Sequence, residues 1–487
     1  MNTTLIVFVV LYLLGTLAIG VWAGTRVKNT ADFAIAGRSL PLIMVVTTTF
    51  ATWFGAETVM GIPAKFVQGG LGAVVEDPFG AGMCLVLVGL FFAAKLYQKN
   101  LLTIGDFYRQ RFGKGVEIFC SLAIILSYLG WVAAQITALG LVFSVLTNGA
   151  MSPATGMVIG TLAVLIYVVI GGFLAVAWTD FIQMIVLVLG LSAIAVFAAD
   201  LAGGAGVVLD LAVQKDLGKF LPAMTFTDLA FFIAAALTMM LGSIPQQDVF
   251  QRVMSAQDAK TAQRGAVIGG ISYILFAFVP MFIVLAAVVV MGDKAMDLAQ
   301  NDYQRVLPSF IMGHMPLLMQ ILFFGALLSA IKSTSSATLL APTTSFVENI
   351  LKQIRPGMTD KQQLLAMRVA LVVFAFAVLV YAIAMQGTPI YELVSGAYQV
   401  TLVGAFVPLV MGLYWQRATT QGAIFSIFAG IATWVLFFPQ VTTWGEAFPG
   451  QLAGLIAAFA GMLVGSLAPQ VLANRHDHVS HHLKPHP

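Results

Sequence analysis

Hydroxyl groups and one ammonium group interrupt an otherwise apolar segment near residues 316–350. The stretch SAIKSTSSATLLAP, residues 329–342, follows the apolar run MPLLMQILFFGALL without a turn signal between them. On an ideal helix, Ala330, Ser333 and Thr334 share one face, because residues three and four apart lie one above the other. Two interpretations remain open for this face. Its oxygen atoms could bind a small cation, or the hydroxyls could bond back to carbonyl groups of their own helix.

Lys332 lies on the opposite face of the same predicted helix. A lysine near the centre of a membrane costs about 2.5–3.5 kcal/mol on insertion scales, so it needs a partner or water. We expect its ammonium group to pair with a carboxylate on a neighbouring helix, and Glu57 is one candidate. It could instead line an aqueous path, or bend towards the hydroxyl face and act as a charge switch in place of a cation.

Two other apolar segments contain residues that break helices. The segment TTTFATWFGAETVMGIPAKF, residues 47–66, mixes glycine, threonine, a carboxylate and proline, and TMMLGSIPQQDVFQRV, residues 238–253, places glycine, proline and two glutamines at its end. Unwinding a helix frees backbone carbonyl groups, which can coordinate a cation, and such backbone is tolerated where it lines a cavity. A pair of interrupted segments at corresponding places therefore favours a transporter binding site.

The elements that position these residues are predicted to be membrane-spanning helices. The 487 residues are 60% hydrophobic and 9% charged, against about 25% charged in soluble domains. Apolar runs are long enough to cross the bilayer as helices. The sequence predicts an all-α integral membrane protein with about 13 spans, at 3–24, 40–63, 72–97, 116–147, 153–173, 176–199, 226–251, 264–291, 316–350, 364–386, 389–415, 419–438 and 449–468.

The broken spans divide the predicted transporter domain, residues 1–470, into repeats. Each opens a set of five spans, at 40–199 and 226–415, and an odd number of spans gives the two sets opposite orientations in the membrane. One helix at 3–24 precedes them, two helices at 419–468 follow, and a His-rich tail occupies 471–487. This pattern predicts an inverted repeat.

Basic residues indicate the orientation. With the N-terminus outside, 18 of the 24 basic residues fall in inner loops and tail, Arg252 among them. The positive-inside rule then predicts a multi-pass protein of the plasma (inner) membrane, with its N-terminus outside and its C-terminus in the cytoplasm.

Four stretches of the chain resemble the sodium:solute symporters, a family that includes sodium/proline, sodium/galactose and high-affinity choline transporters. They are TWFGAETVMG, GGFLAVAWTDFIQ, GSIPQQDVFQRVMSAQDAKTAQRGAVIGG and GALLSAIKSTSSATLLAPTTSFVENI, in the order expected for the family. The resemblance covers about residues 1–470 and is nearest to the choline-transporter branch and its bacterial relatives. It implies a LeuT-like 5+5 inverted repeat with one extra N-terminal helix and two C-terminal helices.

The resemblance also implies the ligands of a sodium ion. The matching positions place backbone carbonyl groups at Ala51, Phe54 and Ala330, and the hydroxyls of Ser333 and Thr334, around the ion. Asp180 matches an acidic residue near the inner end of this site. Family positions and polar residue types together suggest solute-binding residues near the midplane, namely Trp53, Glu57, Trp131, Gln135, Gln246, Gln247 and Tyr398. Ala81 and Gln246 replace aromatic residues of the choline branch, so a full aromatic box for a quaternary amine is missing.

These observations predict a secondary active transporter that couples sodium entry to symport of a small polar or zwitterionic solute, such as an amino acid or an amine-like compound, by alternating access. A proton-coupled or sodium-independent transporter of a monocarboxylate or another small solute is the main alternative, and a membrane sensor or channel is the alternative of another class. No nucleophile–base pair or metal cluster suggests an enzyme. We expect sodium as the coupling ion, no cofactor, the solute and the lipid bilayer as partners, and no nucleic acid.

Overall fold

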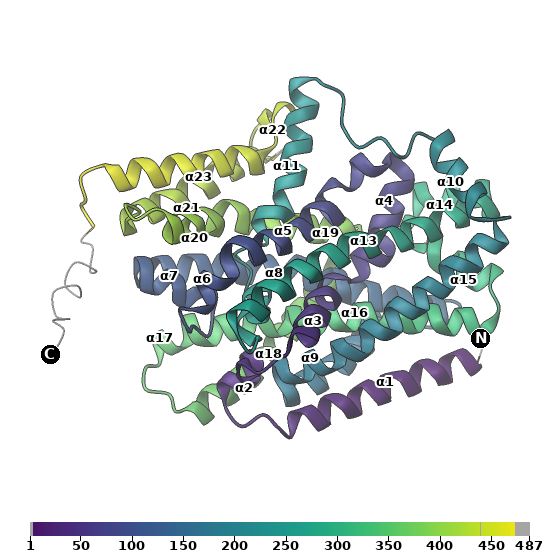
Figure 1. Ribbon diagram of the computed structural model, residues 1–487, viewed down its shortest axis with the longest axis horizontal. Coiled ribbons are helices and arrows are strands. Elements are labelled where there is room, and N and C mark those ends of the chain that lie inside the picture. The colour runs from purple at the N-terminus through teal and green to yellow at the C-terminus, as the bar shows by residue number, and fades with distance from the viewer. Residues whose placement is uncertain (1–2, 439, 473–487) are drawn as a thin grey trace.

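The protein is a bundle of helices whose long members run roughly along one axis of the molecule (Figure 1). In this computed structural model, residues 3–438 and 440–472 are described. Most of the predicted tail at 471–487 lies outside the described residues. Within the described part, the helices are accompanied by a single isolated β-bridge between Leu40 and Ala256. The helix bounds are α1 Thr3–Gly24, α2 Thr30–Ile35, α3 Leu42–Trp53, α4 Ile62–Gly69, α5 Ala81–Leu87, α6 Ala93–Tyr97, α7 Ile104–Phe112, α8 Lys114–Leu146, α9 Pro153–Leu201, α10 Ala205–Gln214, α11 Phe226–Gly242, α12 Gln247–Ser255, α13 Ala259–Met291, α14 Asp293–Asn301, α15 Val306–His314, α16 Leu317–Ser345, α17 Lys352–Ile354, α18 Asp360–Ala384, α19 Ile390–Thr401, α20 Val407–Tyr414, α21 Thr420–Leu436, α22 Trp444–Ala447 and α23 Gly450–Leu467.

Polar caps set where several helices begin. Thr103 and Thr359 each accept a hydrogen bond from the backbone amide three residues later, and the side chain at that position bonds back, which makes capping boxes for α7 and α18. Ser152 caps α9, whose first residue is Pro153. Each cap satisfies amide groups that have no partner within the helix.

Helix α9 holds two of the predicted spans and folds back at Gly172. This residue has φ 51° and ψ −145°, a conformation open mainly to glycine. In a straight helix Tyr167 and Asp180 would be separated by about 20 Å along the axis. Instead the Tyr167 hydroxyl donates to the carbonyl of Lys332, and Asp180 accepts from Ser333, the next residue on α16. The two halves of α9 therefore lie side by side against α16.

The two segments with helix-breaking residues are bent. Helix α3 and the helical segment Glu57–Gly69 meet at 56°, and α11 and α12 meet at 46°. Both breaks fall where the sequence places glycine or proline, which interrupt the regular hydrogen bonding of a helix. The bends expose backbone groups inside the bundle rather than at its surface.

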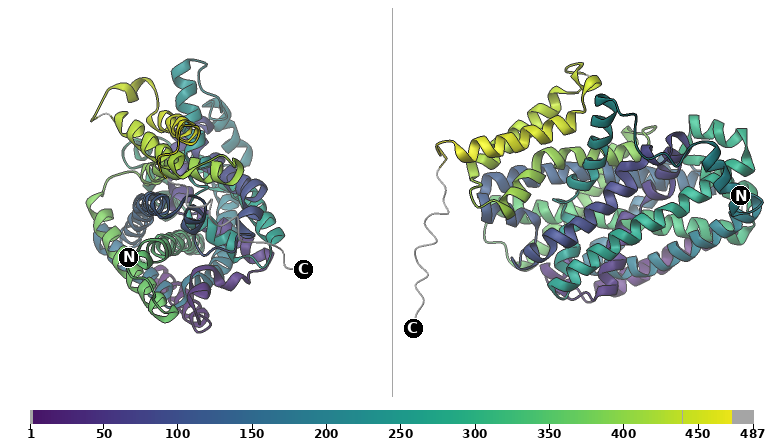
Figure 2. Two further views of the ribbon diagram at one scale, coloured as in Figure 1. Left: turned by 90° about the vertical axis from the view of Figure 1, so that its left-hand side faces the viewer. Right: turned by 45° about the horizontal axis from the view of Figure 1, so that its top comes forward.

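Nine helices among the described residues are long and apolar enough to cross a membrane, or up to 11 if each bent pair is one span. The hairpin in α9 and the 17-residue α21 cover the remaining predicted spans, but the count of 13 stays a prediction. Helix α1 runs along one edge of the bundle, and α21 and α23 lie along the opposite side in both views (Figures 1 and 2). Small residues allow α21 and α23 to pack closely, since Gly430 and Gly454 each face the other helix.

Helix α16 passes through the middle of the bundle. All its residues from Ala326 to Ser345 are buried, including every hydroxyl of the stretch at 329–342. Large apolar side chains instead cover the outside, as at Val196, which is 73% exposed, and Leu275, which is 66% exposed. The polar groups are therefore inside and the apolar groups outside, the arrangement suited to a lipid environment.

Candidate functional site

The broken end of α3 lies directly against α16. The Thr334 hydroxyl donates a hydrogen bond of 2.7 Å to the carbonyl oxygen of Thr52. Gly55 makes this approach possible, because a Cβ atom there would lie 2.7 Å from Thr334 Oγ1 and 2.5 Å from Glu57 Oε2. The end of α3 leaves its last carbonyl groups without the amides that a continuing helix would supply. Ala51 lies in the last turn of α3, and Phe54 is the residue that follows its end.

Asp180 joins three helical segments at the same place. Its carboxylate accepts from Thr48 of α3 at 2.5 Å and from Ser333 of α16 at 2.6 Å, and all three residues are buried. A carboxylate held between two hydroxyls, beside the end of a broken helix, forms an oxygen-rich site suited to a hard cation.

The hydroxyls of α16 divide into two groups. Ser335 and Thr338 donate to carbonyl groups of their own helix, at 2.6 and 2.7 Å. Ser333 and Thr334 reach across to Asp180 and α3 instead. Of the two interpretations of the polar face, back-bonding therefore holds for Ser335 and Thr338. Ala330 lies one turn before Ser333 and Thr334 and is also fully buried.

Lys332 does not pair with a carboxylate, so that expectation was wrong. Its ammonium group donates to the Thr16 hydroxyl of α1 and lies 4.9 Å from the centre of the Tyr167 ring. Within the described residues, no ion pair includes Lys332. The pairing with Glu57 fails for a further reason, because Glu57 is bound on the other side of α16 by residues of α8. The side chain points away from the hydroxyl face, as the helical geometry predicts.

Glu57 is held by two residues of α8. Its carboxylate accepts from Trp131 Nε1 at 3.0 Å and from Gln135 Nε2 at 2.6 Å. The amide oxygen of Gln135 accepts from the backbone amide of Ala56 at 3.0 Å. This network ties the broken segment to α8. The Glu57 carboxylate and the Thr334 hydroxyl both lie against Gly55. The carboxylate therefore also lies beside the proposed ion site.

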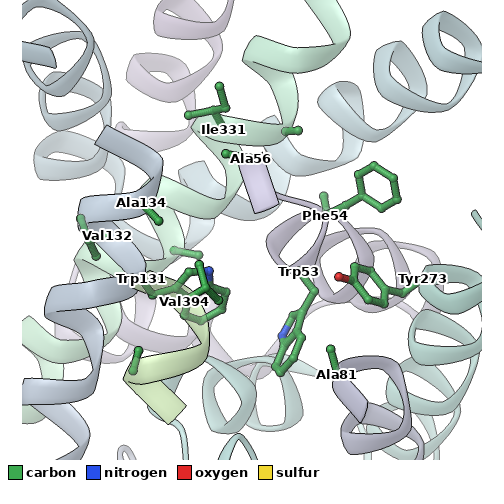
Figure 3. Packing of buried hydrophobic residues seen from close by; sticks show 14 of the residues in the cluster. Trp53, Phe54, Ala56, Ala81, Trp131, Val132, Ala134, Tyr273, Ile331 and Val394 are labelled. Carbon is green, nitrogen blue, oxygen red and sulfur yellow. The ribbon is translucent and has the colours of Figure 1, made fainter. Parts of the chain in front are cut away.

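Three predicted solute-binding residues form an aromatic cluster. The Trp53 and Trp131 ring centres are 5.8 Å apart, and Tyr398 lies 6.1 Å from Trp53 and 5.4 Å from Trp131. Figure 3 shows Trp53 between Trp131 and Tyr273 in that view. Trp53 Nε1 and the Tyr398 hydroxyl are buried without a hydrogen-bond partner. A buried donor without a partner is costly, so these two groups are suited to bind a polar ligand.

The two glutamines at the start of α12, the N-cap Gln246 and the first residue Gln247, face different neighbours. Gln246 donates to Ser127 at 2.9 Å and to Thr401 at 3.4 Å. Tyr128, the residue after Ser127, stacks on Trp131 of the aromatic cluster, so Gln246 lies near that cluster. Gln247 instead accepts from the backbone amide of Ile104 on α7 at 2.9 Å. The structure therefore does not bring Gln247 to the other predicted solute residues.

Arg252 is a buried residue of α12, so the prediction that it lies in an inner loop was wrong. Only 2% of it is exposed, and its guanidinium donates to the carbonyl oxygens of Thr48 and Asp248 and to the Thr52 hydroxyl. It thus binds α3 on the same segment as Asp180 does. Asp248 lies four residues earlier on α12, but the guanidinium contacts its backbone carbonyl, so the spacing of the two side chains does not indicate this burial.

Comparisons with known proteins identify the family of the chain. The model of the sodium:solute symporter family matches residues 33–430. The chain belongs to the sodium:solute symporter family. The symporter is 25% identical to the high-affinity choline transporter 1 of Caenorhabditis elegans, over 96% of this chain and 85% of the relative. It is 28% identical to the high-affinity proline transporter PutP of Bacillus subtilis (strain 168), over 91% of this chain and 94% of the relative.

Solved structures show the same fold. A Na⁺-coupled sialic acid symporter in a substrate-bound outward-open state matches 95% of this chain and 97% of its own, with a TM-score of 0.84 and 21% identity. Mhp1, a nucleobase-cation-symport-1 family transporter in a closed conformation, matches with a TM-score of 0.60 and 16% identity, over 90% of this chain and 94% of its own. The prediction of an all-helical, LeuT-like membrane protein is therefore confirmed.

The family assignment establishes the general function. The symporter is a multi-pass membrane protein that couples sodium to the transport of a small organic solute, and sodium is the coupling ion. Its relatives are transporters, not enzymes. The prediction of sodium-coupled symport is confirmed at this level.

Proposed function

We propose that the symporter binds sodium between the broken end of α3 and α16, and that this ion prepares the site for a small polar or zwitterionic solute, amino acid or amine-like. The carbonyl groups of Ala51, Phe54 and Ala330 and the hydroxyls of Ser333 and Thr334 are the proposed ligands. The observation that carries the proposal is the 2.7 Å bond from Thr334 to the Thr52 carbonyl, which puts α16 in contact with the unwound segment.

Asp180 supplies the negative charge of the site. It bonds both Ser333 and Thr48, and so it orients hydroxyls on the two sides of the ion. A bound cation favours the arrangement in which α3 and α16 are in contact, because its ligands come from both. Ion and solute then stabilise each other's binding, which is thermodynamic coupling.

The proposed solute site adjoins the ion site through Glu57. The aromatic faces of Trp53, Trp131 and Tyr398 attract a cationic group. The unpartnered Trp53 Nε1 and Tyr398 hydroxyl add hydrogen-bonding groups. Glu57, Gln135 and Gln246 provide carboxylate and amide groups. Gln247 is left out, because its side chain is bound to α7. Alternating access in the plasma membrane, with the N-terminus outside, completes the proposal.

Uptake into proteoliposomes tests the ion site. Radiolabelled proline and choline, the solutes named for the relatives, are offered with an inward sodium gradient and with potassium instead. We expect Ser333→Ala and Thr334→Val to raise the sodium concentration for half-maximal uptake by up to about tenfold each. One lost polar contact is worth about 0.5–1.5 kcal/mol, and about 1.4 kcal/mol corresponds to a tenfold change in affinity. Ser335→Ala and Thr338→Val are matched controls, because both hydroxyls donate to carbonyl groups of α16 itself.

Equal effects of both pairs of variants would refute the assigned ion site. Uptake driven equally well by a proton gradient without sodium would instead favour the proton-coupled alternative for this chain.

A further inference from the structure

A groove of about 400 Å³ lies between the continuation of α16 and α18. The helical segment Phe346–Leu351 and α17 continue α16 to Ile354, and α18 begins at Asp360. Because both helices are long and apolar enough to cross a membrane, the loop that joins them lies at a membrane surface. Figure 1 shows this loop at the outside of the bundle. One end of the groove is therefore at the surface of the bilayer, and the rest faces its hydrocarbon.

The groove follows one face of α18. Beyond Gln362, its lining residues on this helix are Leu365, Ala366, Val369, Ala370 and Val373. Leu365 is 61% exposed and Val373 is 63% exposed, so the face is open to its surroundings. From position 362 to position 373 the helix rises by about 16 Å, about half of the roughly 30 Å hydrocarbon core. The groove thus has the length of an acyl chain in one leaflet.

The end of the groove nearest the loop is polar. Arg355 lines it, and its guanidinium takes part in none of the ion pairs that the described residues form. Gln362 lines the same end. Its side-chain oxygen accepts from the backbone amide of Thr359, so its NH₂ group is the part that can bind a ligand. A guanidinium and an amide NH₂ group are hydrogen-bond donors suited to the oxygens of a phosphate.

The acidic side chains near this end are bound to other groups. Asp360 accepts from the backbone amide of Thr30 at 3.2 Å, and Glu348 accepts from Lys352 at 2.6 Å. Lys361 is exposed, and the ion pairs of the described residues do not include it. Basic residues outnumber acidic ones between positions 348 and 361, three to two. The polar end of the groove therefore has a net positive charge.

We propose that this groove binds a phospholipid with a negatively charged headgroup. Arg355 and Gln362 bind the phosphate, and one acyl chain lies along α18, where the small side chains of Ala366 and Ala370 make room for it. The positive charge favours an anionic headgroup over a zwitterionic one, as in other basic pockets between membrane helices. The bound lipid contacts both α18 and the continuation of α16, so it stabilises the folded symporter.

Lipid titration of the full-length symporter in detergent tests the site. Native mass spectrometry counts the bound lipid, and the thermal unfolding temperature is a second measurement. Phosphatidylglycerol supplies a negative headgroup with chains, phosphatidylcholine a zwitterionic headgroup with chains, and glycerol 3-phosphate a phosphate without chains. We expect saturable binding of phosphatidylglycerol, with a dissociation constant at least tenfold below that of phosphatidylcholine, and no binding of glycerol 3-phosphate at the same concentrations.

Two variants separate the headgroup contact from the chain contact. Arg355→Gln should raise the dissociation constant for phosphatidylglycerol about tenfold; Lys260→Gln is its control, because Lys260 is exposed on α13 and does not line the groove. Ala370→Trp should weaken binding by at least as much without changing the charge, because the indole fills the groove. Val380→Trp is its control, since Val380 is 67% exposed on the same helix but outside the groove.

Equal affinities for phosphatidylglycerol and phosphatidylcholine would overturn the proposal. So would glycerol 3-phosphate that binds as tightly as the lipid, which would indicate a site for free phosphate. Variants at 355 and 370 that bind phosphatidylglycerol as their controls do would also overturn it. The unfolding temperature of each variant without added lipid shows that it is folded, so weaker binding in a variant as stable as the unaltered protein is assigned to the groove itself.

Discussion

Replacing Gly55 with alanine should disturb the ion and solute sites together. The added Cβ would lie 2.7 Å from Thr334 Oγ1 and 2.5 and 2.9 Å from the two carboxylate oxygens of Glu57. None of these neighbours is a free side chain. Thr334 is bonded to the Thr52 carbonyl, and Glu57 is held by Trp131 and Gln135. The methyl group therefore forces α3 and α16 apart or breaks one of these bonds.

The size of the expected loss of sodium affinity follows from those contacts. An extra methyl group in a packed interior costs about 1–3 kcal/mol. If that cost falls on the sodium-bound arrangement, in which α3 and α16 touch, it corresponds to about a 5–150-fold loss of sodium affinity. The half-saturation concentration for the solute should rise as well, because Glu57 is a proposed solute-binding residue and also lies beside the proposed ion site.

Sodium titration of uptake in proteoliposomes measures this effect, and the sodium dependence of the thermal unfolding temperature checks it without transport. Gly396→Ala is the matched control, since a Cβ at that position meets no atom within 4 Å. A Gly55→Ala variant that matches Gly396→Ala in sodium titration and in thermal stability would refute the reasoning that these two sites meet at Gly55.

Three further substitutions test other contacts. Lys332→Met should keep sodium-dependent uptake and leave thermal stability equal or higher, because it removes a buried charge without a carboxylate partner; loss of sodium dependence would restore the charge-switch hypothesis. Trp131→Phe should raise the half-saturation concentration for solute about fivefold, from loss of a bond worth about 1 kcal/mol, with sodium affinity unchanged in the same uptake assay. Arg252→Lys should lower the thermal unfolding temperature, because lysine cannot reproduce the three bonds of the guanidinium group, worth about 1.5–3 kcal/mol; an unchanged temperature would contradict that role.

Much of the architecture could be predicted because membrane spans are defined locally. Most predicted spans overlap a helix that is long and apolar enough to cross a membrane, or a bent pair of helices. The two bends could also be predicted, since glycine and proline interrupt a helix through their own backbone chemistry. The shared face of Ser333 and Thr334 follows from helical geometry alone.

Other features depend on residues far apart in the chain. Lys332 could be placed on the opposite face of α16, but its partner Thr16 is 316 positions away. Arg252 was predicted to lie in a loop because it follows an apolar run. It is buried because α12 packs against α3. Gln247 and Gln246 are adjacent and chemically identical, yet only their neighbours send one towards α7 and the other towards α8.

The sequence by itself determined the membrane environment, the helical segments, the points where two of them break and the family of the chain. These properties depend on hydropathy, backbone preference and short motifs, all of which act between near neighbours in the chain. The tertiary structure decided which hydroxyls cross to another helix and, among the described residues, which buried charges lack an ionic partner. Those outcomes depend on how distant helices pack, because a buried polar group is stabilised by whichever partner the fold brings within hydrogen-bonding distance.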